Sequence, residues 1–549
     1  MSDVFDIADR FCDRLGALDP CSATYAGIPG HDHEMTDYSP AGTAARVDLV
    51  RETLAALDIA TYENDDDRRA ADVMRERFAL DLEQYDAGER LRDIRILGSP
   101  IQSARQCFDL MHLERDEEWA VAAERMRRVP DALESIEASL REGVARGLVA
   151  ARRQALACAD QAATWGGQGD DVPFFRALAG RRPDDTDLAD AAEVATAGYA
   201  RLASYLRDEY APAADPRNAV GRDRYALFAR DFNGIELDLD ETYAWGWEEL
   251  HRIENAMRRV AERILPGNSI DEVIEHLDAD ETRAIEGADE FIAWNQGLID
   301  QTIADLDGTH FDIAAPLKKC EAMIAAPGSA AAMYYTAPTE DFSRPGRTWY
   351  PTMGETRFPL WKEVSTCYHE AVPGHHLQVA QVVYLADRLS RYQRLFGFVS
   401  GHGEGWALYA ERLMGELGYL EDPGFEMGML AAQAMRAVRI VVDIGMHLEL
   451  PIIDGEPHAG ETWTPELALP FVVSRSRFPE VFMRSEVDRY LGWPGQAISY
   501  KVGERVWLEC RAEAKRRKGA EFDLKAFHTY ALDLGSMGLA QLREELARF

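Results

Sequence analysis

The chain has 549 residues, of which 46% are hydrophobic and 28% charged, a composition typical of a folded globular protein rather than a disordered or fibrous one. It contains 60 Lys and Arg residues against 96 Asp and Glu residues, which gives a formal net charge of −36. Because a field of that sign repels phosphate groups, the charge argues against nucleic acids and membrane surfaces as partners.

The segment Met1–Asp6 has neither the basic nor the apolar part of a signal peptide. No later stretch reaches the roughly 18 apolar residues of a membrane span. These features predict a cytoplasmic protein, either a monomer or a homodimer. The 7 cysteines are odd in number and scattered, with no close CxxC pair. We therefore expect reduced cysteines that pack in the core.

Long stretches rich in Ala, Leu, Glu and Arg carry apolar residues at three- and four-residue spacing, which is typical of amphipathic helices. The clearest are Ala44–Tyr85, Asp116–Trp165 and Asp240–Ile264. Asp240 and Glu241 stand where an N-cap and an acidic first turn belong, so the third of these helices is predicted to begin there. The pattern indicates a mainly α fold.

Stretches that contain prolines or glycines interrupt the helical pattern. The segment Ala211–Asn218 contains two prolines and predicts a division between an N-terminal helical lobe, residues 1–215, and a metal-binding catalytic lobe, residues 216–549, in one continuous fold. Between Ala325 and Pro359, glycines and prolines surround aromatic segments, which favours short strands.

Histidines are concentrated in one part of the chain. Of the 13 present, His369, His375, His376 and His402 lie close together in sequence. His369 and Glu370 match the start of the H-E-x-x-H zinc motif, in which two histidines bind the ion and the Glu is the general base. In an unbroken helix, however, His376 would lie about 10 Å along the axis from His369, too far to share an ion.

Pro373 and Gly374 provide the break that the site needs, because proline removes a helical hydrogen bond and glycine tolerates an unusual backbone. The chain can then fold either His375 or His376 back toward His369. Glu404 on a second predicted helix is the expected third ligand, as in other catalytic zinc sites with two His and one Glu.

Glu411 lies seven positions after Glu404 on the same helix face, and we expect it to hold a ligand imidazole in place. His376 is expected beside the site or as the alternative ligand. The competing interpretation is a kinked core helix whose histidines are merely hydrogen-bonded, with Glu404 and Glu411 as solvated surface carboxylates.

This motif resembles the bacterial domain-of-unknown-function family eight hundred and eighty-five, whose pattern is H-E-x-x-P-G-H. Over roughly the last 330 residues, further segments are similar to that family: Tyr334-Tyr335, Ser343–Gly346, Arg439–His447, Glu486–Tyr490, Pro494–Gly503 and Phe527-His528. The resemblance implies an elongated, nearly all-helical fold like that of thermostable-carboxypeptidase-type zinc metallopeptidases. It also implies a central channel, a small β-ribbon beside the metal helix, and His375 rather than His376 as the ligand.

Several further residues suit a peptidase site. Tyr500 and Lys501, or Arg489 and Tyr490, are candidate donors to a developing oxyanion. Basic residues that could receive a peptide's terminal carboxylate are Arg436, Arg439, Arg489 and Lys501. Salt bridges to the abundant acidic residues are the competing role for each of them. An extended substrate is expected beside Tyr334 and Tyr335.

The sequence favours a zinc-dependent metallopeptidase that acts like a carboxypeptidase on short peptides, with Glu370 as general base. Manganese and cobalt are alternatives to zinc. The competing functions are a metal-dependent amidase with a non-peptide substrate, and a non-catalytic protein that binds metal or peptide.

Overall fold

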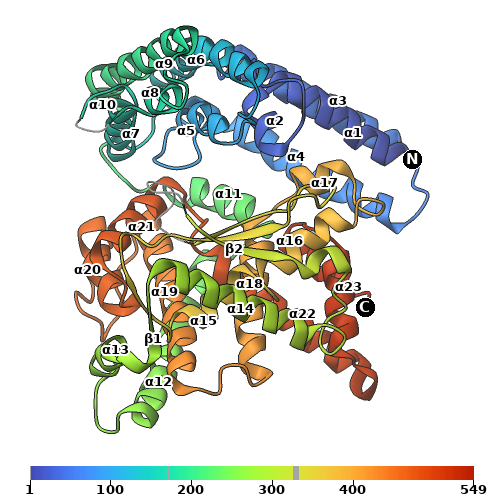
Figure 1. Ribbon diagram of the computed structural model, residues 1–549, viewed down its shortest axis with the longest axis vertical. Helices are drawn as coiled ribbons and strands as arrows, with labels where there is room; N and C mark the ends of the chain where they lie inside the picture. The colour runs from blue at the N-terminus through green and yellow to red at the C-terminus, as the bar shows by residue number, and fades with distance from the viewer. Residues whose placement is uncertain (1, 170–171, 326–332) are drawn as a thin grey trace. The chain divides into compact units, whose positions relative to one another are not determined.

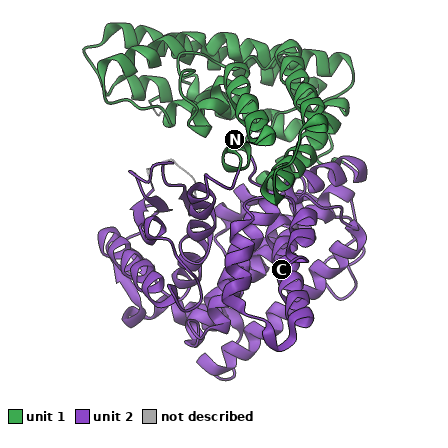
Figure 2. Cartoon of the chain, turned by 90° about the vertical axis from the view of Figure 1, so that its right-hand side faces the viewer, with its two compact units in different colours: residues 1–220, 390–396, 488–493 green, residues 221–389, 397–487, 494–549 purple. Residues whose placement is uncertain are grey.

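Residues 2–169, 172–325 and 333–549 are described by a computed structural model. Helices make up most of this structure and strands form only two small sheets (Figure 1), which confirms the mainly α fold. The chain divides into two units (Figure 2). The first comprises residues 1–220, 390–396 and 488–493, and the second comprises residues 221–389, 397–487 and 494–549.

Among its described residues, the first unit contains helices and one isolated bridge, between Ala151 and Asp215, but no strand. Its α-helices are α1 (Asp3–Leu18), α2 (Pro20–Ala26), α3 (Pro40–Ile59), α4 (Asp65–Asp86), α5 (Pro100–Gln106), α6 (Asp116–Ala145), α7 (Arg152–Trp165), α8 (Phe174–Ala179), α9 (Thr186–Tyr205), α10 (Ala211–Ala213) and α17 (Arg391–Leu395). Helix α9 packs against α6, α7 and α8, and its many alanines allow this close packing.

The second unit holds the longer helices and both sheets. Its α-helices are α11 (Arg222–Asn233), α12 (Leu239–Ile264), α13 (Ile270–Ala279), α14 (Ala288–Leu306), α15 (Glu363–Glu370), α16 (His375–Tyr384), α18 (Ser400–Glu416), α19 (Pro423–Leu448), α20 (Pro465–Ser476), α22 (Ser499–Lys518), α23 (Leu524–Asp533) and α24 (Leu539–Leu546). Helix α21 (Glu480–Gly492) contributes residues to both units.

Helix α19 lies at the centre of the second unit. Nearly every side chain from Leu430 to His447 is buried, on all faces of the helix. Such a helix must be surrounded by other elements, and α12, α15, α18, α20 and α22 pack against it. The helices that carry His369, Glu404 and Tyr500 therefore all pack against one buried helix.

Helices α18 and α22 approach each other so closely that two glycines are required at the crossing. A Cβ on Gly405 would lie 2.5 Å from the Gly503 backbone. A Cβ on Gly503 would lie 2.0 Å from the carbonyl oxygen of Gly401. The crossing fixes the backbone position of Glu404, which directly precedes Gly405.

The sheets lie beside the helices of the second unit. Strand β4 (Gly346–Tyr350) pairs in parallel with β2 (Cys320–Ile324) and antiparallel with β3 (Tyr334–Thr336), so β4 is central. Strand β1 (Ala284–Glu286) pairs antiparallel with β5 (Arg357–Pro359). Helix α14 packs along β2, and α16 contacts β4. Strands β3, β4 and β5 occur within the stretch Ala325–Pro359 where the sequence predicts strands, whereas β1 and β2 precede it. Residues 326–332 of that stretch lie outside the described residues.

The predicted helix bounds need correction at three places. The stretch Ala44–Tyr85 is two helices, α3 and α4, and Asp116–Trp165 is α6 and α7. Helix α12 is capped not by Asp240 but by Asp238, whose carboxylate accepts hydrogen bonds from the Asp240 and Glu241 amides. Both acidic residues therefore lie in the first turn, where their negative charges interact favourably with the positive end of the helix dipole.

Candidate metal centre

The helix that carries His369 ends directly after it. Helix α15 stops at Glu370, and the Gly374 amide turns back to donate a hydrogen bond to the Tyr368 carbonyl at 3.0 Å. A Cβ on Gly374 would lie 1.9 Å from the His369 carbonyl oxygen, so no other residue fits this turn. The Trp406 indole N–H holds the turn by donating to the Pro373 carbonyl at 2.8 Å. The predicted break thus lets α16 begin beside the end of α15.

The break brings together three of the predicted residues. Each of His369, His375 and Glu404 offers one potential ligand atom, and these atoms all lie within 4.8 Å of one another. The Nε2 atoms of both histidines lie 3.4 Å from the same oxygen, Oε2 of Glu404. The two rings are nearly perpendicular, at 86°, with their centroids 4.8 Å apart. The three ligand atoms are therefore close enough to bind one metal ion.

Glu411 holds the imidazole of His369 from the opposite side. Its Oε1 lies 2.8 Å from Nδ1 of His369, and its Oε2 accepts a hydrogen bond from the Ser365 hydroxyl at 2.5 Å. The Arg436 guanidinium lies 3.5 Å from the same Glu411 oxygen, and all four side chains are buried. Because the carboxylate accepts the Nδ1 proton, Nε2 is the nitrogen left to face Glu404.

The electrostatics of the cluster favour a cation. Burial opposes protonation of His369, but the neighbouring carboxylates of Glu404 and Glu411 outweigh burial and raise its pKa to about 9. Burial likewise opposes ionisation of Glu404, yet its two histidine partners hold the pKa of this carboxyl well below its ordinary value. The carboxylate therefore stays ionised and attracts positive charge in its buried surroundings.

One atom of the cluster lacks a hydrogen-bond partner among the described residues. Glu404 Oε2 is buried, and neither nearby histidine nitrogen makes a hydrogen bond to it of acceptable geometry. A buried carboxylate oxygen that accepts no hydrogen bond is costly, and a metal ion satisfies it. Two imidazole nitrogens and a carboxylate oxygen are also the donor set of catalytic zinc sites, so these residues fit such an ion.

His376 is turned away from this cluster. Its Nε2 lies 2.8 Å from the Leu317 carbonyl, and its Nδ1 lies 3.0 Å from the Tyr335 hydroxyl. Burial lowers the pKa of His376 to about 4, so the ring is neutral, donates to Leu317 and accepts from Tyr335. Both nitrogens are used, and His375 rather than His376 faces Glu404.

Glu370, the predicted general base, is the last residue of α15 and is 7% exposed. Its carboxylate makes no hydrogen bond or ion pair within the part of the chain that the structure describes. It is therefore buried next to the His369 ligand position without being committed to another partner.

Lys501 is not available to a substrate. Its Nζ contacts the side-chain oxygens of Gln433 and Glu249, both at 2.7 Å, and that of Glu504. These three acceptors use all three of its N–H donors, and the side chain is 1% exposed. Lys501 therefore joins α12, α19 and α22, and the catalytic role predicted for it requires correction.

Tyr500 lies closer to the cluster. Its ring packs against two guanidinium groups, 5.9 Å from that of Arg436 and 4.5 Å from that of Arg439. Arg439 also donates to Glu486 at 2.7 Å and is buried. Arg436, one of the basic residues predicted to bind a carboxylate, contacts the cluster through Glu411.

The remaining predicted residues make the following contacts. Arg489 lies over the ring of buried Tyr490 at 5.0 Å, and both belong to the segment 488–493 that groups with the first unit. Tyr334 stacks on Trp349 across β3 and β4, with ring centroids 5.9 Å apart. Tyr335, its neighbour, is the residue of β3 that reaches α16.

Ser365 was missed by the sequence interpretation, although a signal was present. It precedes His369 by four positions, so both lie on one face of α15 and can share an acceptor. The partners of Lys501 and His376 carried no comparable signal, because Glu249 and Leu317 are distant in sequence.

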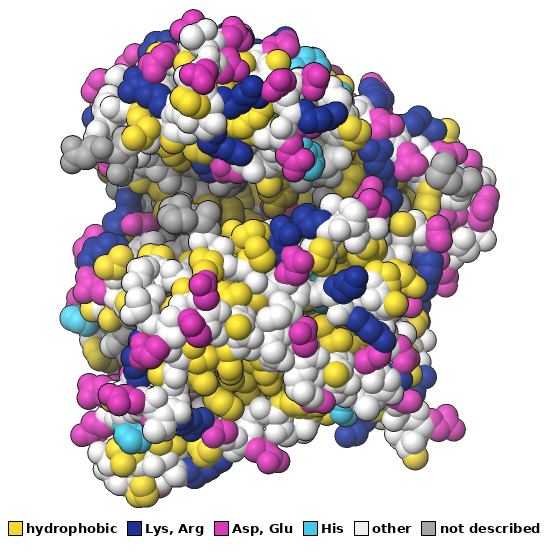
Figure 3. Space-filling model, in the orientation of Figure 1, with side chains coloured by type: hydrophobic (Ala, Val, Ile, Leu, Met, Phe, Trp, Pro, Cys, Tyr) yellow, Lys and Arg dark blue, Asp and Glu magenta, His cyan; other side chains and the backbone are white. Residues whose placement is uncertain are grey.

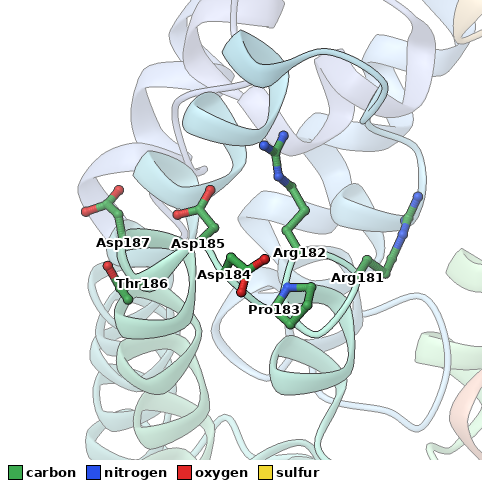
Figure 4. Close-up of a pocket in the computed structure, with 7 residues that line it drawn as sticks. All are labelled: Arg181, Arg182, Pro183, Asp184, Asp185, Thr186 and Asp187. Atoms are coloured by element: carbon green, nitrogen blue, oxygen red, sulfur yellow. The ribbon is translucent and has the colours of Figure 1, made fainter.

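A surface pocket of about 570 Å³ lies between α8 and α9 in the first unit, lined by residues 181–187 (Figure 4). Two of its charged residues are paired outside it, since Arg182 contacts Asp116 at 2.6 Å and Asp187 contacts Arg127. None of the predicted site residues line it, and it suggests no chemistry.

Two solved structures share the fold over the full length of the chain. "The crystal structure of the putative lipoprotein from Colwellia psychrerythraea" matches with a TM-score of 0.85 and 22% identity, covering 100% of this chain and 99% of that one. "The structure of a putative lipoprotein of unknown function from Shewanella oneidensis" matches with a TM-score of 0.74 and 19% identity, covering 98% and 99%.

The predicted cytoplasmic location is contradicted by these neighbours, since both are described as lipoproteins. In the part of the chain that the structure describes, no helix is both long and apolar enough to cross a membrane.

A third solved structure, "Structure of Pyrococcus furiosus Carboxypeptidase Apo-Mg", covers 100% of this chain and 95% of its own. Its TM-score of 0.40 and 13% identity are too low to carry an argument. A comparison with curated proteins finds no match.

The family comparison agrees with the resemblance of the His369–His375 motif. A family model described as "Bacterial protein of unknown function (DUF885)" matches residues 20–546, which is nearly the whole chain. The chain therefore belongs to the DUF885 family.

Proposed function

We propose that this protein is a metal-dependent hydrolase that cleaves short peptides. The observation that carries the proposal is the convergence of His369, His375 and Glu404, whose ligand atoms lie within 4.8 Å of one another. The unpartnered Glu404 oxygen in the same cluster supports it. Zinc is the ion that best suits two imidazoles and one carboxylate, and manganese or cobalt can occupy the same donors.

When bound at these residues, such an ion supplies Lewis-acid chemistry, which polarises a substrate carbonyl and makes a nearby water more acidic. Glu370 takes the proton of that water and returns it to the leaving amine. Its buried, uncommitted carboxylate suits this task, because no salt bridge must break before it accepts a proton.

Glu411 and Ser365 act through His369. By fixing the proton on Nδ1, they keep the Nε2 lone pair directed to the ligand position through every turnover. Tyr500 is the proposed hydroxyl donor to the carbonyl oxygen, since its ring packs on Arg436 beside the cluster.

Carboxypeptidase-like cleavage is the more specific part of the proposal. It requires a cation that receives the terminal carboxylate of a peptide, and Arg436, at 3.5 Å from Glu411, is the candidate that contacts the cluster. Arg439 is held by Glu486, and Lys501 by three acceptors. Direction of cleavage therefore depends on whether Arg436 also binds substrate.

Metal analysis combined with a peptide-library digest tests the proposal. The purified protein should contain a transition metal and should release short products that mass spectrometry identifies. His369→Ala and Glu404→Ala should lose both metal and activity. His458→Ala is the matched control, because His458 is an exposed histidine that pairs with Glu461 at 3.0 Å.

Glu370→Gln separates binding from catalysis. The amide cannot accept a proton at neutral pH, so this variant should keep its metal and fold while hydrolysis falls about 100-fold or more. Wild-type rates in Glu370→Gln would remove the general base. Full metal occupancy in both ligand variants would remove the metal site itself.

A further inference from the structure

His402 is not one of the three residues whose ligand atoms converge in the metal cluster. It precedes Glu404 by two positions on α18, and side chains two positions apart leave an α-helix about 200° apart. Because Glu404 is directed toward His369 and His375, His402 is directed to another side of α18. The His402 side chain is nevertheless buried, so its contacts lie inside the protein.

Gln378 of α16 is the polar partner of His402. Its Nε2 amide donates a hydrogen bond to Nδ1 of His402 at 3.1 Å, and both side chains are buried. Gln378 follows His375 by three positions, and residues three positions apart are neighbours on the surface of a helix. The hydrogen bond therefore joins α16 near His375 to α18 near Glu404.

Two buried tryptophans hold the surroundings of this hydrogen bond. Trp507 of α22 packs on the His402 ring, with ring centroids 5.4 Å apart, and its indole N–H donates to the His402 carbonyl at 3.2 Å. Trp406 of α18 donates to the Pro373 carbonyl in the turn that precedes α16. The His402 ring is therefore fixed on α18 by packing, and Gln378 connects it to α16.

The hydrogen-bonding capacity of the pair is only partly used, although the pair is buried. Nε2 of His402 and Oε1 of Gln378 have no hydrogen-bond partner among the described residues. Burying polar atoms without partners costs free energy, and replacing both members of such a pair by apolar side chains of similar shape is often neutral or stabilising. Stability alone therefore does not account for a glutamine and a histidine at these positions.

On the basis of the metal-dependent function proposed above, we propose that Gln378 and His402 are a positioning pair that fixes the separation of His375 and Glu404. Neither member of the pair is itself a ligand. Their hydrogen bond holds α16 and α18 where Nε2 of His375 and Oε2 of Glu404 lie 3.4 Å apart. Ligand distances in a metal site must hold to within about 0.2 Å, so a small shift of α16 along α18 weakens binding.

A double variant of the full-length protein separates positioning from packing. Gln378→Met combined with His402→Phe replaces both polar side chains by apolar ones of similar shape. Its urea midpoint, measured with a chelator present, should therefore be at least that of wild type. Affinity for zinc, measured by competition with a chelator, should nevertheless fall about 10-fold. His402→Asn should keep near wild-type affinity, because its amide oxygen can take the position of Nδ1 and accept the hydrogen bond from Gln378.

Tyr409→Phe is the matched control, because the Tyr409 hydroxyl makes another buried hydrogen bond of α18, to His528 at 2.6 Å. This variant should have a lower urea midpoint and unchanged affinity for zinc.

Three results would overturn the positioning role and leave the metal site intact. The first is wild-type affinity in the double variant. The second is a double variant that is less stable than wild type or does not fold, since the pair would then be structural. The third is an affinity of His402→Asn as low as that of the double variant. If wild type itself bound no zinc, the proposed metal site and the positioning role would both be wrong.

Discussion

Two successive residues at the end of α15 meet different surroundings. The His369 ring is fixed by Glu411 on one side and faces Glu404 on the other. The Glu370 carboxylate follows it without a fixed partner among the described residues. A ligand must be held still, whereas a general base must exchange protons freely, and the burial and hydrogen bonding of these two residues differ accordingly.

Glu411→Gln tests the fixing of His369. The amide oxygen is a weaker acceptor for the Nδ1 proton than the carboxylate, so metal affinity should fall about 10- to 100-fold. A competition titration against a chelator measures the change. Glu416→Gln is the control on the same helix, since Glu416 pairs with Arg511 at 2.8 Å and is more exposed. Equal affinities in the two variants would assign Glu411 a purely structural role.

The buried side chain of His528 should make the stability of the folded protein depend on pH. It is fully buried, stacks on Phe311 with ring centroids 4.9 Å apart, and lies 2.6 Å from the Tyr409 hydroxyl. Burial lowers the pKa of His528 to about 3, below its ordinary value of 6.5. The unfolded chain therefore binds this proton below pH 6.5 while the folded protein does not, so stability is lost as pH falls from 6.5 toward 3.

The effect of His528 should amount to about 2 kcal/mol at pH 5. Urea unfolding at pH 7.5 and pH 5 measures it in wild type and His528→Gln, which cannot be protonated. The variant should lose less stability than wild type between the two pH values. His458→Gln, which changes an exposed histidine, should keep the wild-type dependence. An unchanged dependence in His528→Gln would contradict the prediction.

At the scale of elements, the sequence predicted the break after α15 but not every partner of the helices around it. Pro373 and Gly374 carry a local backbone signal, and the structure uses it to bring His375 to His369. Gaps between helices, as in Ala44–Tyr85, were missed because polar residues continue the periodicity across the turn. The contacts of Lys501 with Glu249 depend on which helices pack together, and no local pattern encodes that.

The crossing of α18 and α22 gives an element-scale prediction. In Gly503→Ala, the new Cβ would lie 2.0 Å from the Gly401 carbonyl and 2.6 Å from the Gly405 Cα. The helices must separate, which should lower the free energy of unfolding by about 1–3 kcal/mol. Because Glu404 precedes Gly405, metal affinity should fall too. Chemical denaturation and metal titration measure both effects.

Gly297→Ala is the control for the crossing. Gly297 is an exposed interior residue of α14, and a Cβ there would meet no atom within 4 Å. Alanine favours a helix over glycine by about 1 kcal/mol, so this variant should be as stable as wild type or slightly more so. If both variants behaved alike, the close approach would not limit stability.

At the scale of the whole molecule, net charge is the dominant feature. Acidic and basic side chains both occur across the face seen in Figure 3, and the formal net charge of the whole chain is −36. Local pairs such as Arg511 with Glu416 neutralise individual arginines. The long-range field is nevertheless negative, and it acts on any charged ligand that approaches.

The charge makes a prediction about substrates of the proposed hydrolase. At low ionic strength, a strongly acidic peptide should be cleaved more slowly than a neutral peptide of equal length, because the negative field of the protein repels the acidic peptide. The two peptides have the same length, so size does not account for the difference. Salt screens charges beyond about 8–10 Å at physiological ionic strength, so the two rates should converge as salt is added. A ratio of rates that is independent of salt would show that the field does not act on binding.

In the same assay, a neutral peptide with a free C-terminus should react faster than its C-terminal amide if Arg436 receives the carboxylate. Arg436→Gln should remove that preference, whereas Arg511→Gln, which changes an arginine paired with Glu416, should keep it. Equal rates for acid and amide in wild type would leave a metal-dependent hydrolase without carboxypeptidase specificity.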